Sequence, residues 1–119
     1  FTKLQHLGGD YWNGLINLDK AYSLTSLVIC KYPFPNLVQF SALRNLEILH
    51  IYGSKIQNLD GVEKLSIREL SLARNNKLDD IHKINEVSSL ENLEIECCKK
   101  LLDFSFLKLK ATPILRIYS

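Results

Sequence analysis

Pairs of apolar residues that flank a single residue recur along this chain at a nearly constant interval. The five clear copies are Leu27-Val28-Ile29, Leu49-His50-Ile51, Leu70-Ser71-Leu72, Leu93-Glu94-Ile95 and Leu115-Arg116-Ile117. Their leading leucines are 22, 21, 23 and 22 residues apart, and we interpret Leu4-Gln5-His6, 23 residues before Leu27, as a weaker sixth copy. Alternation with period two predicts short, half-buried strands. The fixed interval predicts a solenoid, in which each repeat buries its apolar side against its neighbours.

Apolar residues at steps of three follow the predicted strands. In the clearest repeat they are Ile56, Leu59, Val62 and Leu65. A step of three keeps side chains on one side of 3-10-like turns, whereas an α-helical stripe needs alternating steps of three and four. Closely spaced strands opposite wider turns predict a curved coil with the strands on its concave surface. We predict one domain over residues 1–119, with five full repeats plus a terminal strand, beginning near residues 1, 24, 46, 67, 90 and 112.

The third repeat carries a family resemblance. Its pattern Leu46-x-x-Leu49-x-Ile51-x-x-Ser54-x-Ile56-x-x-Leu59-x-x-Val62-x-x-Leu65 resembles the 22-residue leucine-rich repeats of the phosphatase-1 regulatory subunit and the bacterial internalins. The resemblance implies an α/β-type solenoid, a right-handed coil with short parallel strands on the concave side and 3-10 or short helical turns on the convex side. In that family an asparagine at the ninth position forms a ladder of hydrogen bonds. Here Asn75 alone matches and Cys98 is a tolerated variant, so the ladder is expected to be patchy.

Composition adds a few limits. The 119 residues are 46% hydrophobic, and a net charge of +2 with both signs interspersed gives no sign of a nucleic-acid partner. No run of 18 apolar residues is present, so we expect no membrane span. Cys30 lies three repeats, roughly 14 Å, from Cys97 and Cys98, too far for a disulfide, which favours reduced thiols and a cytoplasmic setting. Because the sequence begins inside a repeat and lacks methionine, we expect it to be part of a longer solenoid.

The alternation also predicts which strand residues face outward on the concave surface. In the first repeat it places Gln5 and Leu7 outward and His6 inward. Over the remaining repeats we predict a partner-binding surface formed by Val28, Cys30, Ile48, His50, Tyr52, Glu69, Glu94, Glu96, Arg116 and Tyr118. Its first five members make an apolar and aromatic patch, and the three glutamates make an acidic strip that favours a basic or mixed-charge partner. The alternative is that the apolar members are ordinary strand formers covered by further chain.

The sequence predicts no catalytic or metal site among these outward-facing residues. Cys30 and His50 are expected to be neighbours, but zinc needs about four converging ligands, and Cys97-Cys98 alternate in direction. We therefore predict no enzyme activity, no metal and no cofactor. The predicted function is a non-catalytic protein–protein interaction module. The alternatives are a substrate-positioning segment of a larger enzyme such as a ubiquitin ligase, and a structural spacer that self-associates through open strand edges.

Overall fold

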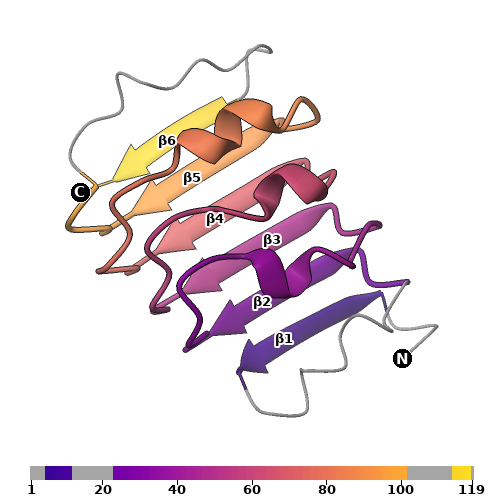
Figure 1. Ribbon diagram of the computed structural model, residues 1–119, viewed down its shortest axis with the longest axis horizontal. Coiled ribbons are helices and arrows are strands. Elements are labelled where there is room, and N and C mark those ends of the chain that lie inside the picture. Colours follow the sequence, from indigo (N-terminus) through magenta and orange to yellow (C-terminus); the bar gives the residue numbers. More distant parts are fainter. Residues whose placement is uncertain (1–4, 12–22, 102–113, 119) are drawn as a thin grey trace.

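Six parallel strands form a single sheet. The computed structural model describes residues 5–11, 23–101 and 114–118 (Figure 1). The strands are β1 (His6–Asp10), β2 (Ser26–Cys30), β3 (Ile48–Tyr52), β4 (Glu69–Ala73), β5 (Asn92–Glu96) and β6 (Ile114–Tyr118). Each strand pairs only with its neighbours in chain order, β1-β2-β3-β4-β5-β6. The prediction of a parallel-strand repeat solenoid is confirmed.

The connections cross one face of this sheet. Figure 1 shows the links between β2 and β5 passing over the same side of the strands. They contain the only helices in the described ranges, which are the 3-10 helices η2 (Val38–Phe40), η3 (Val62–Lys64) and η4 (His82–Glu86). None of these helices has the length or apolar character that crossing a bilayer would require. The opposite side of the strands, which we call the open sheet face, is free of these three links.

The core lies between the sheet and the turns. Alternate strand residues such as Leu49 and Ile51 are fully buried, because the pleat directs them toward the turns. They meet apolar turn residues that recur at steps of three, including Leu59 and Val62, which are also fully buried. One continuous cluster joins these layers from Leu24 to Leu101. Each layer is therefore stabilised mainly by contacts with the layers on either side.

Hydrogen bonds lengthen the strand ladder at its amino-terminal end. The carbonyl of Thr25 accepts from the backbone nitrogens of Glu47 and Ile48, at 2.8 and 3.0 Å. The carbonyl of Glu47 accepts in the same way from Arg68 and Glu69 in the next layer, at 2.7 and 3.1 Å. This repeated bifurcated bond fixes each layer against the next. The open sheet face is consequently one continuous hydrogen-bonded surface rather than a set of independent strands.

The first strand differs from its predicted register. Leu7, and not Leu4, pairs with Leu27, and Gly8 pairs with Val28. His6 is exposed, whereas the sequence predicted it to point inward. A shift of three residues reverses the two faces of a strand, because side chains alternate with period two. Leu4 and the predicted repeat starts near residues 1 and 112 lie outside the described residues.

The predicted asparagine-ladder position is buried in four consecutive layers. It holds Tyr32, Ser54, Asn75 and Cys98, which are between 0% and 8% exposed. Each polar group finds a partner, and the Cys98 thiol lies 3.8 Å from the carbonyl oxygen of Leu72. Burial raises the pKa of that thiol, although hydrogen bonds with Asn75 act in the opposite direction. The single asparagine thus belongs to a mixed series of side chains that satisfy buried backbone groups in different ways.

Candidate functional site

The predicted partner-binding residues lie on the open sheet face. They alternate along their strands with buried core residues, and register places them in three rows that cross the sheet. One row runs Ile48–Glu69, the central row runs His50–Ser71–Glu94–Arg116, and the third runs Tyr52–Ala73–Glu96–Tyr118. All the predicted residues keep some solvent exposure. Tyr118 is the most exposed aromatic residue among them, with 51% of its surface accessible. The structure thus places the predicted residues together, on one face.

The apolar patch spans strands β2 and β3. We use this name for Val28, Cys30, Ile48, His50 and Tyr52. Val28 pairs with His50 and Cys30 pairs with Tyr52, so four of its members form two adjacent cross-strand pairs. Ile48 lies on the same face, opposite Ser26. All five are partly exposed, which leaves a continuous apolar and aromatic surface on two neighbouring layers.

His50 connects this patch to the acidic strip. Its Nε2 lies 2.8 Å from Oε2 of Glu69, and its Nδ1 lies 3.3 Å from the hydroxyl of Tyr52. The rings of His50 and Tyr52 meet edge to face, with centroids 6.1 Å apart. A neutral imidazole with its proton on Nε2 donates to the Glu69 carboxylate and accepts from the Tyr52 hydroxyl. The three side chains therefore hold one another in fixed orientations.

Ser71 lies beside this cluster without joining it. It pairs with His50 across strands β3 and β4 and is 7% exposed. A serine, a histidine and a carboxylate are the components of a nucleophilic triad, which requires a free imidazole nitrogen facing the hydroxyl. Here Glu69 and Tyr52 occupy both ring nitrogens of His50. The arrangement suits the orientation of a binding surface better than the activation of the Ser71 hydroxyl.

A shallow depression of about 120 Å³ opens next to His50. Its walls combine hydroxyl, amide and charged side chains over leucines at its base, and they are formed by His50, Tyr52, Glu69, Leu70, Ser71, Asn92, Leu93, Glu94 and Arg116. Its carboxylates, on Glu69 and Glu94, outnumber the guanidinium of Arg116. The volume suits one side chain rather than a large ligand. Charge balance favours a cationic side chain with hydrogen-bond donors.

Sequence reasoning missed two parts of this site. Ser71 and Asn92 line the depression, but neither was included in the predicted surface. The signal was present, because both residues lie on the outward side of the alternating pattern. The contact between His50 and Glu69 was also missed, since Glu69 pairs with Ile48 and reaches His50 diagonally across the strands.

Neither metal-binding groups nor comparisons with known proteins identify a function for this chain. No group of three or more His, Cys, Asp or Glu side chains that could hold a metal ion occurs in the part of the chain that the structure describes. The chain matches no protein-family model and no curated protein. The geometry of the open sheet face is therefore the basis for a functional proposal.

Proposed function

We propose that this chain is a right-handed leucine-rich repeat domain that binds another protein on its open sheet face, without catalysing a reaction. The 22-residue interval, the parallel strands and the buried Asn75 support the leucine-rich repeat identity. The proposed setting is the cytoplasm, where the free thiols of Cys30 and Cys98 would remain reduced.

The observation that carries this proposal is the junction between the apolar patch and the depression. Tyr52 supplies a partly buried aromatic ring, a residue type enriched among the anchors of protein interfaces. His50 and Glu69, joined at 2.8 Å, lie at the boundary between apolar and acidic surface. A partner that offers an apolar side chain beside an arginine or lysine would match both halves. The fixed orientation of His50 lowers the entropy lost when such a partner binds.

Capture of partners from a lysate by matched variants tests this function. Tyr52→Glu and Ile48→Glu place a charge in the apolar patch, and both residues are partly exposed, so the core stays intact. Val38→Glu is the matched control, because Val38 is 50% exposed and lies in η2, on the side of the turns. We expect a protein retained by the wild type and by Val38→Glu to be lost from both patch variants.

The other functions predict different results. A partner that all variants retain would place the interface elsewhere and contradict the proposal. The patch variants could instead lose a self-associated species, which sedimentation would show as a fall in mass. If no other protein is captured, that result would favour a spacer that assembles with itself. Recovery of a catalytic protein whose substrates depend on Tyr52 would favour an accessory segment that positions substrate.

A further inference from the structure

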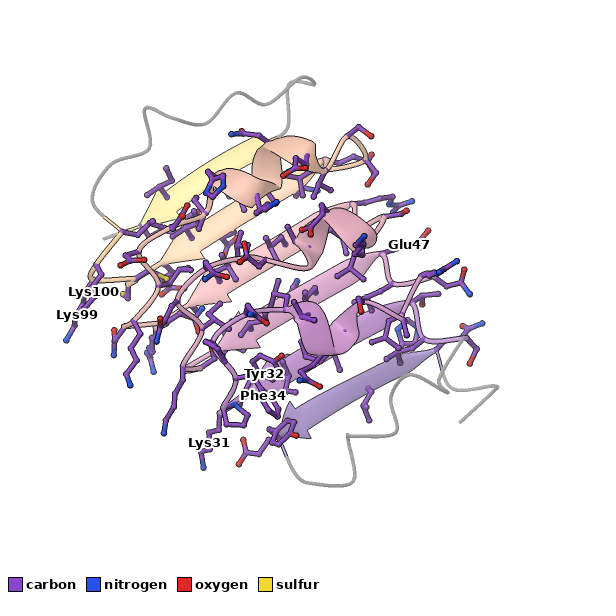
Figure 2. All side chains as sticks on the ribbon, viewed as in Figure 1. Lys31, Tyr32, Phe34, Glu47, Lys99 and Lys100 are labelled. Carbon is purple, nitrogen blue, oxygen red and sulfur yellow. The ribbon has the colours of Figure 1, made fainter. Side chains whose placement is uncertain are left out.

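Basic side chains gather along a second surface, the edge formed by the turns at the carboxyl ends of the strands. We call it the basic edge and define it by Lys31, Lys55, Arg74, Lys77, Lys99 and Lys100, all of which are exposed. Lys31 and Arg74 directly follow β2 and β4, and the remaining four lie within four residues of a strand end. Figure 2 shows Lys31, Lys99 and Lys100 extending outward from this side of the molecule. Lysines and an arginine from four successive layers thus form one row.

Most of these cations have no ion-pair partner within the described residues. Lys31 pairs with Asp10 at 3.2 Å, but both side chains are largely exposed. At the opposite edge, Arg68 pairs with Glu91 at 3.0 Å, and among the turns Lys83 pairs with Glu86 at 3.2 Å. Carboxylates are also present on the basic edge, at Asp79 and Glu96, but the cations outnumber them. The basic edge is therefore a surface with a net positive charge, because the carboxylates of the described residues do not neutralise it.

Two of these cations occupy backbone positions that favour glycine. Lys31 and Arg74 adopt φ values of 60° and 57°, and the equivalent residue after β3 is Gly53, with φ 59°. A side chain in this left-handed region is less stable than glycine, because its Cβ atom crowds the neighbouring carbonyl oxygen. Cations at these two turns thus add charge to the edge at a local cost in stability. That cost is consistent with a role for the charge outside folding.

Lys77 and Lys100 line a single hollow. The turn from the end of β3 to the next buried apolar residue, Ile56, is one residue shorter than the corresponding turns to Leu78 and Leu101. The lysines immediately precede Leu78 and Leu101 in these longer turns. Together with Gln57 and Asp79 they surround a hollow of about 330 Å³. Two ammonium groups and an amide in one concave site provide several donors for a carboxylate.

We propose that the basic edge binds an acidic segment of a partner protein, in extended conformation and running across the layers from β2 to β5. Neighbouring strands are about 4.8 Å apart, so these four layers span about 14 Å, the length of four to five extended residues. Alternate carboxylates in such a segment are about 6.7 Å apart, within reach of the flexible lysine side chains. One carboxylate would lie in the hollow between Lys77 and Lys100.

The surface fits an acidic peptide better than a nucleic acid. Asp79 and Glu96 interrupt the row, and the open sheet face beside it carries Glu69 and Glu94. A peptide can place its carboxylates between these repulsive groups, whereas the phosphates of a nucleic acid repeat without such gaps. Specific placement of charge, rather than total charge, is therefore the property that this edge would recognise.

Fluorescence anisotropy with a labelled peptide of about ten residues that alternates Glu and Ser tests the proposal. We expect saturable binding that weakens as salt rises above about 0.1 M, because these contacts are exposed to solvent. The variant with Lys55→Gln, Lys77→Gln and Lys100→Gln should bind about tenfold more weakly, since it loses three exposed ion pairs that each strengthen binding about twofold. Circular dichroism should show that this variant is folded, because all three side chains are exposed.

The matched control carries Arg44→Gln, Lys64→Gln and Arg68→Gln, which remove three exposed cations that are not part of the basic edge. It should bind the peptide within about twofold of the wild type. Equal loss in both variants would show a non-specific charge effect and would overturn the proposal, as would absence of binding to the wild type. Tighter binding of a single-stranded oligonucleotide than of the peptide at the same salt concentration would assign the edge to nucleic acid instead. We expect substitutions on the apolar patch to leave this assay unchanged, so its result is independent of the proposed function.

Discussion

The side-chain oxygen of Asn75 accepts two hydrogen bonds from Ser54, one from its backbone nitrogen at 2.9 Å and one from its hydroxyl at 2.6 Å. The Asn75 amide nitrogen donates to the carbonyl of Ile51 at 3.1 Å. Asn75 is completely buried, so water cannot replace these bonds. One side chain therefore satisfies the backbone of the turn that follows β3 and joins it to the next layer.

Replacement of Asn75 by alanine should lower the free energy of unfolding by about 2 to 3 kcal/mol, because it leaves buried donors and an acceptor without partners. Asn76→Ala is the control, since Asn76 is exposed, and it should change stability by less than about 0.5 kcal/mol. Urea unfolding followed by circular dichroism measures both. Similar stabilities for the two variants would mean that the buried ladder contributes little to the fold.

Gly61 should tolerate no side chain. It precedes η3 with φ 101°, and a Cβ atom there would lie 2.7 Å from the backbone carbon of Leu37 and the nitrogen of Val38 in the layer before. Gly61→Ala should therefore destabilise the chain by about 3 kcal/mol through overpacking and backbone strain. Gly53→Ala has the strain without the clash, because nothing lies within 4 Å of its Cβ position, and should cost only about 1 kcal/mol. Thermal unfolding of both variants checks this order, since Gly61→Ala should have the lower midpoint.

Removal of a cation from the basic edge should affect stability in opposite directions at two positions. Arg74→Gly should stabilise the chain by about 0.5 to 1 kcal/mol, because glycine relieves the left-handed backbone at φ 57°. Lys55 has no positive φ, so Lys55→Gly should instead destabilise by about 0.5 kcal/mol. Both variants should weaken binding of the acidic peptide. No gain in stability from Arg74→Gly would show that the conformation at Arg74 carries no cost, and an equal gain from both variants would assign the effect to loss of the cation instead.

The repeat itself could be predicted from sequence because its signal is local and redundant. Leu49 and Ile51 alternate as half-buried strand residues must, and the same pattern returns in each later layer. The predicted register of the first layer was wrong because Leu4 and Leu7 both fit an apolar strand position. The observed pairing of Leu7 with Leu27 spans a shorter interval than the other repeats. Gly8 has no side chain, so the sequence around it does not show an apolar and polar alternation that would identify the correct register.

The surfaces were harder to predict because they depend on distances between layers. Alternation identified His50 and Glu69 as outward residues, but their 2.8 Å contact requires knowledge of side-chain direction across two strands. The basic edge was missed since no sequence segment is strongly basic. Lys77 and Lys100 become neighbours only when two longer turns are stacked.

Tyr32 should make the fold sensitive to alkaline conditions. Its ring is buried and stacked on Phe40 with centroids 4.8 Å apart, and its hydroxyl donates to the carbonyl of Asn36 at 2.8 Å (Figure 2 labels Tyr32). Burial, together with the neighbouring phenol of Tyr11, raises the pKa of Tyr32 well above its usual value of 10.0. Above about pH 10 the unfolded chain loses a proton that the folded chain keeps, so the stability contributed by the neutral phenol falls as pH rises.

Tyr32→Phe isolates this effect. Near neutral pH the variant should be about 1 kcal/mol less stable than the wild type, because it loses the hydrogen bond to Asn36. Above about pH 10 the gap should narrow, since phenylalanine has no proton to lose and only the wild type acquires the linkage penalty. Urea unfolding of both proteins across this range gives the difference at each pH and cancels the titration of all other groups. A gap that stays constant through pH 10 would contradict the burial of a neutral Tyr32 phenol.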